Sequence, residues 1–264
     1  MSKIRKLYDA IRPKKITYCN IVTKKANEIL KDKYIVITGG SSGIGKAIAK
    51  KSVEEGAKVV IIGRNEEKLY HAMKDIGDGA KYLAIDVNDS MLLEKSEKCL
   101  GHKITNVVNN AGVYINHSGD YNEDDFEKSI NTNLKAPFFI TQKYVKYCIK
   151  NCIKGNVLMT ASNRGLMGDT TPYGISKAGL INCVQGFARE NISHEIRINA
   201  ICPGMTASNI NGIGQNDNLY QESCKGKRVL LAEEQAEVAC FLMSDVSKCI
   251  NGAIIPCDEG DYLR

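Results

Sequence analysis

Tyr173 and Lys177 are the residues of this sequence whose types and spacing are best suited to chemistry. They lie four positions apart in a stretch with a helical pattern, so both side chains project from one face. A free tyrosine has a pKa of about 10, too high for proton transfer near neutrality, and a neighbouring ammonium lowers that pKa by favouring the phenolate. Because an isolated Tyr-x-x-x-Lys pair is usually surface decoration, its meaning depends on the rest of the chain.

Two further side chains could take part in such chemistry. Ser162 follows a strand-like run from Gly155 to Ala161, which places its hydroxyl at the carboxyl edge of a sheet, where ligands collect. A serine at this point can equally be a helix N-cap or a turn residue. Asn133 lies inside a long helical stretch, and because asparagine is a poor interior helix former, a local kink with a water-binding role is expected there.

A glycine-rich segment follows the apolar run Tyr34–Thr38 and precedes another helical pattern. Its glycines, Gly39, Gly43 and Gly45, let backbone N–H groups at a helix N-terminus approach a phosphate. The spacing differs from the usual Gly-x-Gly-x-x-Gly fingerprint, so the loop is expected to be wider. An ordinary glycine-rich turn between strand and helix is the alternative interpretation.

The ends of the next two strands offer further ligand contacts. Arg64 stands where dinucleotide folds often carry a carboxylate for the ribose hydroxyls, and its guanidinium suits a 2′-phosphate. This favours NADP(H) over NAD(H), unless Arg64 is simply an exposed residue that starts a helix. Asp86, followed by Val87, could accept a hydrogen bond from an adenine amino group or cap the next helix.

Apolar runs and helical patterns alternate along the chain from Tyr34 onward. The predicted strands are 34–38, 58–62, 81–85, 105–109, 155–160, 196–201 and 253–257. The predicted helices are 44–55, 65–75, 89–100, 122–151, 173–191 and 233–243. Continuous apolar strands are typical of sheets covered by helices on both faces, so the sequence predicts a single-domain α/β fold with a doubly wound parallel sheet of about seven strands.

An ordered set of motifs now makes a family resemblance specific. The set is Thr38-Gly39-x3-Gly43-x-Gly45, Asn109-Asn110-Ala111-Gly112, Asn133, Ser162, Tyr173-x-x-x-Lys177 and Pro203-Gly204. Together these motifs resemble the short-chain dehydrogenase/reductase family, and 3-oxoacyl-ACP reductases within it, over about residues 33–260. The resemblance implies a Rossmann-type sheet with strand order 3-2-1-4-5-6-7, a nicotinamide cofactor and a homotetramer or homodimer.

The resemblance also assigns roles to individual residues. It implies that Tyr173 exchanges the proton, that Ser162 binds the substrate oxygen, that Lys177 lowers the tyrosine pKa and holds the ribose, and that Asn133 holds a relay water. The residues expected to bind the cofactor are Gly39, Ser41, Ser42, Gly43, Ile44, Gly45, Arg64, Asp86, Val87, Asn110, Ala111, Gly112, Tyr173, Lys177, Pro203, Gly204 and Thr206.

The chain departs from the family pattern at two places. Ser162 precedes Tyr173 by eleven residues, two fewer than is common in the family, and the deletion is placed in Asp169–Pro172, where it would reshape one wall of the substrate pocket. Glu259 stands where glycine is commoner, which is expected to affect subunit packing. The polar segment 207–227 has the composition of a mobile substrate lid.

Residues 1–32 form a basic extension before the predicted domain of residues 33–264. Ten of the first 33 residues are lysine or arginine and three are acidic, so the net charge of +6 comes mostly from this segment and does not indicate nucleic-acid binding by the domain. Two amphipathic helices broken at Pro13 are expected here, packing on the body or on a neighbouring subunit, with a basic membrane-surface or nucleic-acid-binding arm as the alternative.

The remaining composition indicates a cytoplasmic protein. Ten cysteines are scattered without a Cys-x-x-Cys pair, which predicts reduced thiols and no metal site. No apolar run is long enough for a membrane span, and no signal peptide is recognised at the N-terminus.

These features predict an NADP(H)-dependent enzyme that reduces a carbonyl of a small-molecule substrate, a ketone, aldehyde or 3-oxoacyl group, to an alcohol. An NAD-dependent dehydrogenase of secondary alcohols, sugars or hydroxysteroids is the alternative within this class. A nucleotide-binding regulatory protein without turnover is the alternative from another class. The sequence does not name the substrate.

Overall fold

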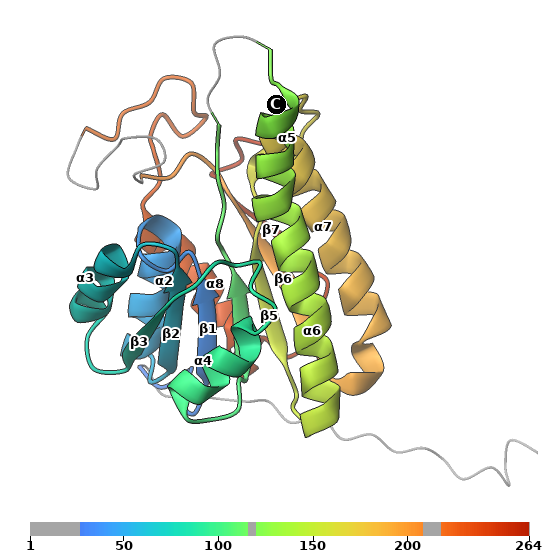
Figure 1. Cartoon of the computed structure of the whole chain (residues 1–264). Helices are drawn as coiled ribbons and strands as arrows, with labels where there is room; N and C mark the ends of the chain where they lie inside the picture. Colours follow the sequence, from blue (N-terminus) through green and yellow to red (C-terminus); the bar gives the residue numbers. More distant parts are fainter. Residues whose placement is uncertain (1–26, 116–119, 208–217, 264) are drawn as a thin grey trace, which may run out of the picture.

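The computed structural model describes residues 27–115, 120–207 and 218–263. It contains a seven-stranded sheet whose neighbouring strands all run parallel, in the order β3-β2-β1-β4-β5-β6-β7, which confirms the predicted order (Figure 1). The strands are β1 (Tyr34–Thr38), β2 (Lys58–Gly63), β3 (Ala80–Ala84), β4 (Asn106–Asn109), β5 (Asn156–Thr160), β6 (Arg197–Pro203) and β7 (Ile254–Cys257).

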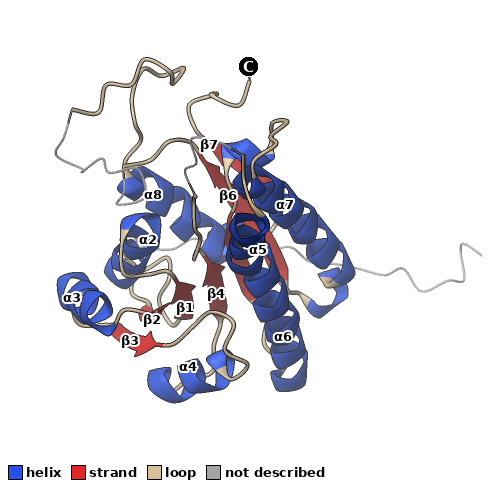
Figure 2. Cartoon of the chain, turned by 45° about the horizontal axis from the view of Figure 1, so that its top comes forward, coloured by secondary structure: helices blue, strands red, loops and turns tan. Residues whose placement is uncertain are grey.

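Helices cover both faces of the sheet (Figure 2). One face carries α2 (Gly43–Glu54), α3 (Glu66–Ile76) and α8 (Ala232–Met243), and the other carries α4 (Leu92–Leu100), α6 (Ala136–Asn151) and α7 (Pro172–Glu190). The helix α5 (Glu123–Ile130) runs into α6 through a π turn, η1 (Asn131–Lys135). Short 3-10 turns are η2 (Asn163–Gly165), η3 (Ile192–His194) and η4 (Asp245–Ser247).

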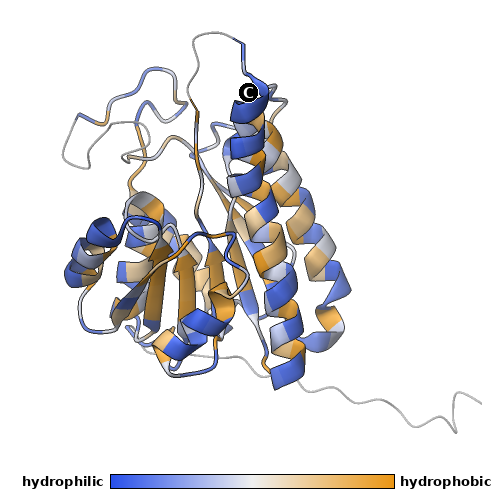
Figure 3. Cartoon of the chain, viewed as in Figure 1, coloured by the Kyte–Doolittle hydropathy of each residue, from blue (hydrophilic) through white to orange (hydrophobic). Residues whose placement is uncertain are grey.

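The apolar runs of the strands explain this three-layer arrangement. In β1, Ile35 and Ile37 are fully buried against α2, α3 and α8, whereas Val36 is fully buried against the opposite helices. Each strand therefore supplies apolar side chains to two cores, and the strands stand out as hydrophobic bands between more polar helices (Figure 3). The parallel direction brings the carboxyl ends of all seven strands to one edge, where the loops collect.

Two sequence-based expectations about helices need correction. The predicted helix 122–151 is not continuous, since the π turn η1 separates α5 from α6. This turn contains Asn133, where a local kink was expected. Ile29 and Leu30 were expected in an amphipathic helix, but residues 27–32 form turns, with left-handed backbone at Asn27 and Asp32. Leu30 is instead fully buried, and its N–H donates to the Glu55 carbonyl at 3.0 Å. The helices expected in residues 1–26 lie outside the described residues.

Candidate active site

The loop between β1 and α2 has the properties of a phosphate site. Ser42 is the N-cap of α2, yet its side chain accepts no capping hydrogen bond, and the first turn of α2 contains no acidic residue. The helices α3 and α5, by contrast, have asparagine caps and two or three acidic residues in their first turns. The donors and the positive end of the dipole of α2 are therefore free for an anion, so this loop fits a dinucleotide phosphate.

Close packing explains why glycine occupies this loop. A Cβ at Gly45 would lie 2.3 Å from Asn110 Nδ2 and 2.4 Å from the Gly39 carbonyl oxygen. Gly39 and Gly43 have positive φ angles of 67° and 52°, which disfavour other residues. The loop therefore holds one shape against the segment that follows β4.

A hydrogen-bonded lock joins the β1 loop to the β4 loop. The Thr38 hydroxyl accepts from the backbone N–H groups of Asn110 at 3.0 Å and Ala111 at 3.1 Å. The Asn110 side chain donates back to the carbonyls of Thr38 and Gly39, both at 3.2 Å. These hydrogen bonds tie the two adjacent loops together at the start of the glycine-rich segment.

We expect Thr38→Val to destabilise the fold by about 2 kcal/mol, because two backbone N–H groups lose their acceptor while the side-chain shape is kept. Chemical denaturation measures this loss. Thr160→Val is the matched control, since the buried Thr160 hydroxyl has no hydrogen-bond partner within the described part of the chain. The control should change the free energy of unfolding by less than about 0.5 kcal/mol. Equal losses in both variants would contradict the proposed lock.

The catalytic candidates meet where β5 ends and α7 begins. Ser162 is buried at the end of β5, and its hydroxyl also accepts from the Arg164 N–H at 3.2 Å, so it caps the turn η2 as well as facing the cavity. Tyr173 lies in the first turn of α7, whose N-cap Thr171 accepts from the Gly174 N–H at 3.0 Å. Lys177 lies one turn later, with its ammonium 5.6 Å from the centre of the Tyr173 ring.

Lys177 is the most deeply buried charged group of the site. The residue is only 3% exposed, and its Nζ donates to the Thr160 carbonyl at 2.7 Å. Burial lowers the pKa of Lys177 to about 8. The ammonium is therefore charged at neutral pH, but at a cost in free energy that the fold has to carry.

The net lowering of the tyrosine pKa that is expected beside Lys177 is not found in the chain without cofactor. Burial raises the pKa of Tyr173, while the hydrogen bond with Ser162 and the charge of Arg164 lower it to a smaller extent. Burial of the phenol outweighs these lowering influences, and the Lys177 ammonium lies over the face of the ring while it donates to the Thr160 carbonyl. The phenol therefore stays protonated at neutral pH, the form required of a proton donor.

Asn133 is held in the π turn by three hydrogen bonds. Its Oδ1 accepts from the Val113 N–H at 2.8 Å, and its Nδ2 donates to the Val113 carbonyl at 3.0 Å and to the Ser176 hydroxyl at 3.1 Å. Both amide hydrogens are thus used, and Oδ1 keeps one acceptor site. A Cβ at Gly112 would lie 3.3 Å from Asn133 Oδ1 and 3.7 Å from Lys177 Nζ, so both side chains reach the backbone at Gly112.

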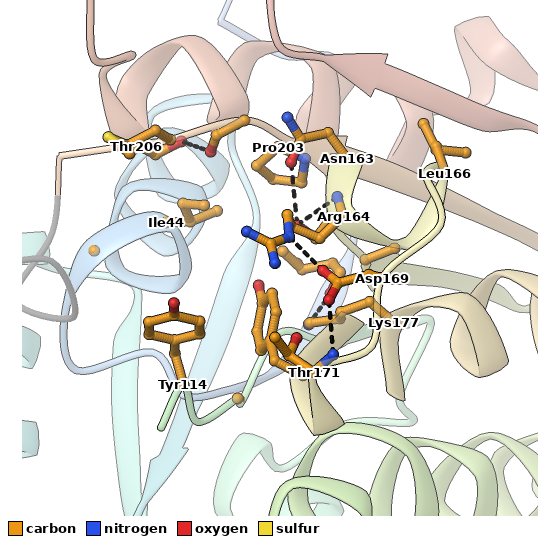
Figure 4. Close-up of a pocket in the computed structure, with 18 of the residues that line it drawn as sticks. Ile44, Tyr114, Asn163, Arg164, Leu166, Asp169, Thr171, Lys177, Pro203 and Thr206 are labelled. Atoms are coloured by element: carbon orange, nitrogen blue, oxygen red, sulfur yellow. Dashed lines mark hydrogen bonds and ion pairs between the residues drawn. The ribbon is translucent and has the colours of Figure 1, made fainter. Parts of the chain in front are cut away.

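One cavity of about 1110 Å³ connects the glycine-rich loop after β1 with the catalytic candidates (Figure 4). Most predicted site residues line it: Gly39, Ser41, Ser42, Gly43, Ile44, Asn110, Ala111, Gly112, Ser162, Tyr173, Lys177, Pro203, Gly204 and Thr206. Gly45 and Asn133 support its wall from behind and do not line it. Such an elongated cavity has room for a dinucleotide that runs from the α2 N-terminus to Tyr173.

The predicted adenosine contacts stand apart from this cavity. Arg64, Asp86 and Val87 do not line it, although they follow β2 and β3 at the same sheet edge. Arg64 is exposed and makes no hydrogen bond or ion pair with the described residues. The carboxylate of Asp86 accepts from the backbone and side-chain N–H groups of Asn88, at 2.8 and 2.9 Å, and so closes its own turn.

Sequence reasoning missed two residues that enter the cavity from the chain's end. Asp261 and Tyr262 line the cavity beside the turn η2. Asp261 accepts from Asn163 Nδ2 at 3.3 Å and from the Lys225 N–H at 3.1 Å. No motif or periodicity marks them, because they follow the last strand in a short turn. The predicted lid is described only in part; its residues 208–217 lie outside the described residues, and Ser223 and Cys224 line the cavity.

Other expectations about the chain concern metals, thiols and membranes. Within residues 27–115, 120–207 and 218–263, no group of three His, Cys, Asp or Glu side chains is arranged to hold a metal ion. The cysteines of these ranges are free thiols. None of the described helices combines the length and apolarity needed to span a bilayer.

The sequence and the fold both match known proteins. The model of the short chain dehydrogenase family matches residues 33–218. A 3-oxoacyl-[acyl-carrier-protein] reductase of Chlamydia muridarum is 35% identical over 247 residues, covering 89% of this chain and 99% of the relative. A meso-2,3-butanediol dehydrogenase of Serratia marcescens is 31% identical over 238 residues, covering 87% of this chain and 94% of the relative.

Solved structures agree with this assignment. A short-chain type dehydrogenase/reductase from Mycobacterium marinum superposes with a TM-score of 0.81 at 26% identity, covering 89% of this chain and 97% of that one. A 3-ketoacyl-(acyl-carrier-protein) reductase from Brucella melitensis, solved in complex with NADH, gives 0.80 at 25% identity, covering 88% of this chain and 99% of that one. The chain therefore belongs to the short-chain dehydrogenase family and is an NAD(P)-dependent oxidoreductase.

Proposed function

We propose that the protein is an NADPH-dependent reductase that converts a carbonyl group of a small molecule to an alcohol. The observation that carries this proposal is the meeting of Ser162, Tyr173 and Lys177 in the cavity that begins at the phosphate loop. Proton donor, oxygen-binding hydroxyl and cofactor site thus share one space. A regulatory protein without turnover would have no need for this arrangement.

The chain's own residues supply the proton and position the substrate. When bound, the reduced nicotinamide supplies the hydride that the carbonyl carbon accepts. The Tyr173 hydroxyl gives its proton to the carbonyl oxygen, and the resulting phenolate is reprotonated from solvent. Ser162, which hydrogen-bonds the phenol, donates to the same oxygen and fixes its position.

Lys177 and Asn133 support this proton transfer. The Thr160 carbonyl takes one N–H of the Lys177 ammonium and leaves the others for the cofactor ribose. The positive charge near the ring stabilises the phenolate that forms when Tyr173 loses its proton. The remaining acceptor site of Asn133 Oδ1 can hold a water that connects Lys177 with solvent.

A substrate screen tests the proposal directly. Ketones, aldehydes and 3-oxoacyl thioesters are offered with NADPH or NADH, and oxidation of the coenzyme is followed by absorbance. We expect reduction of at least one carbonyl class, faster with NADPH. Oxidation of secondary alcohols with NAD⁺ alone would favour the sugar or hydroxysteroid dehydrogenase alternative. Tight binding of the coenzyme without turnover of any class would favour a regulatory role.

Arg64 is the residue proposed to select NADPH. Its guanidinium has no partner within the described chain. Arg64 itself occupies the position directly after β2, and the nearest acidic residues, Glu66 and Glu67, follow in the first turn of α3. We expect Arg64→Gln to weaken NADPH binding about tenfold, since it loses a charge-assisted contact to the 2′-phosphate, and to change NADH binding less than about twofold. Fluorescence titration measures both constants.

Lys68→Gln is the matched control for this prediction. Lys68 is an exposed cation on α3, four residues after Arg64, and its loss changes the local charge equally. Its effect on NADPH binding should stay below about threefold at physiological salt. If Arg64→Gln weakens NADH and NADPH equally, the coenzyme assignment is wrong.

We also propose a cytoplasmic location and a homodimer or homotetramer. The free thiols of the described chain support a reducing compartment. The family membership supports the oligomer, and sedimentation velocity at micromolar concentration tests it.

A further inference from the structure

Arg164 extends a cation into the substrate side of the cavity. It lies in η2, two residues after Ser162, and lines the cavity with 44% of its side chain exposed. Figure 4 shows its guanidinium extending from Asp169 toward Ile44 and Tyr114. A long charged side chain usually extends away from the protein into solvent. The direction of Arg164 along the cavity wall therefore needs a cause.

Asp169 provides that cause. Its carboxylate pairs with Nε of Arg164, and it also accepts from the Thr171 N–H at 2.8 Å. The Asp169 side chain is only 5% exposed, and it packs so tightly on the catalytic helix that a Cβ at Gly174 would lie 2.2 Å from its Cγ. Asp169 thus fixes Arg164 to the same turn of α7 that carries Tyr173.

The ion pair leaves most of the guanidinium free. Only Nε is used, and the two terminal nitrogens of Arg164 donate no hydrogen bond within the described chain. These nitrogens form the planar fork that binds a carboxylate or phosphate through two parallel hydrogen bonds. Arg164 is also close enough to Tyr173 for its charge to lower the pKa of the phenol.

The other charged residues of the cavity wall already have partners. Lys177 is directed to the Thr160 carbonyl, Asp169 to Arg164, and Asp261 to Asn163 and the Lys225 N–H. Beside Tyr173, the ring of Tyr114 packs edge-on with a centroid distance of 5.2 Å and forms an uncharged wall. Among the described lining residues, Arg164 is therefore the cation placed to meet a substrate.

We propose that Arg164 binds an anionic group of the substrate, so that the enzyme acts on carbonyl compounds that also carry a carboxylate or a phosphate. This inference rests on the proposed carbonyl reduction and names its substrate class. The anion pairs with the terminal nitrogens of Arg164, and the carbonyl a few bonds away reaches Ser162 and Tyr173. Asp169 acts as the positioning residue that keeps the guanidinium in place.

Paired substrates test this assignment. Acetoacetate is compared with ethyl acetoacetate, levulinate with methyl levulinate, and dihydroxyacetone phosphate with dihydroxyacetone, each with saturating NADPH. For the wild type we expect kcat/KM at least about tenfold higher for the anionic member of one pair. The pair that shows the preference distinguishes a carboxylate from a phosphate as the recognised group.

Variants assign the preference to Arg164. In Arg164→Gln the anion-to-neutral ratio of kcat/KM should fall about tenfold or more, mainly through KM, and Arg164→Lys should restore part of it. A merely structural role, or an effect through the pKa of Tyr173, would change both members of a pair equally. Arg189→Gln, an exposed change at the far end of α7, should leave the ratio unchanged.

Two results would overturn the inference, and they are separable from failure of the proposed function. If the wild type reduces neutral members as well as anionic ones, or if Arg164→Gln lowers both equally, Arg164 does not select the anion. If no member of any pair is reduced and the screen of ketones, aldehydes and 3-oxoacyl thioesters also finds no substrate, carbonyl reduction itself fails, and calorimetry with the hydroxy acids and NADP⁺ then decides. Loss of anion binding in Arg164→Gln would support the site, and no binding to the wild type would reject it.

Discussion

Replacing Tyr173 with phenylalanine is expected to lower kcat for carbonyl reduction by about a thousandfold, because the reaction loses its positioned proton donor. NADPH binding should stay within about threefold of the wild type, since the ring remains and the phosphate loop lies at the other end of the cavity. Stopped-flow absorbance gives the rate, and fluorescence titration gives the dissociation constant. Together they separate loss of chemistry from loss of binding.

The matched control is Tyr70→Phe, which removes a hydroxyl from an exposed tyrosine on α3. It should leave both quantities unchanged. Turnover at the wild-type rate in Tyr173→Phe would contradict the role of Tyr173 as the proton donor. A loss of NADPH binding as large as the loss of rate would show that Tyr173 acts in binding the cofactor and not in proton transfer.

Replacing Lys177 with methionine should lower the activity but raise the stability at neutral pH. We expect kcat to fall by about a hundredfold, because the phenolate of Tyr173 loses its nearby positive charge and the ribose loses a donor. In the wild type, burial lowers the pKa of Lys177 from 10.5 to about 8, so the charged form costs stability at neutral pH. Methionine fills similar space without that cost.

The sign of this effect follows from proton binding. Between the folded pKa of about 8 and the unfolded pKa of 10.5, the unfolded chain binds more protons, so the wild type gains stability from this residue as the pH rises. At neutral pH the free energy of unfolding of Lys177→Met should therefore exceed that of the wild type. This excess should shrink by about 2 kcal/mol between about pH 7 and about pH 9.5. Urea unfolding at several pH values measures the difference.

Lys146→Met serves as the control for this experiment, because Lys146 is an exposed lysine on α6. It accounts for the general effect of losing one lysine. A difference between Lys177→Met and the wild type that stays constant across the pH range would mean that burial of the ammonium carries no free-energy cost, contrary to the structure.

The strands β1, β2, β4 and β5 could be predicted from the sequence because each is a short apolar run that ends in a polar or glycine residue. β1 has the predicted bounds, and β6 continues two residues further because Cys202 and Pro203 pair with Pro256 and Cys257 of β7. Boundaries shift where side chains form local turns. The helix α4 begins at Leu92 and not at Asp89, because the Asp89 carboxylate accepts from the Met91 N–H at 2.7 Å.

Packing, which no local pattern reveals, decided the remaining differences. Ile29 and Leu30 have helical spacing, yet Leu30 is fully buried beneath the end of α2, and the chain must turn on both sides to bring it there. The sequence placed Lys177 and Tyr173 on one face, but the raised pKa of Tyr173 comes mainly from burial of the phenol, which residue spacing does not show.

The substrate side of the site was the least predictable part. The shortened segment Asp169–Pro172 was expected to reshape one wall of the pocket, but the pairing of Arg164 with Asp169 depends on a loop conformation without periodicity. Asp261 and Tyr262 reach the cavity only because β7 ends at the same sheet edge as β5. Tertiary position, and not residue type, brings these side chains to the site.

Transfer of a labelled hydride directly tests whether the enzyme reduces a carbonyl group with NADPH. The enzyme is incubated with NADPH deuterated at C4 and with the carbonyl panel, and the products are analysed by mass spectrometry. We expect one product to be an alcohol with deuterium on the former carbonyl carbon, formed by the wild type and not detectably by Tyr173→Phe. Carbonyl compounds that all remain unlabelled, although NADPH binds, would contradict this expectation.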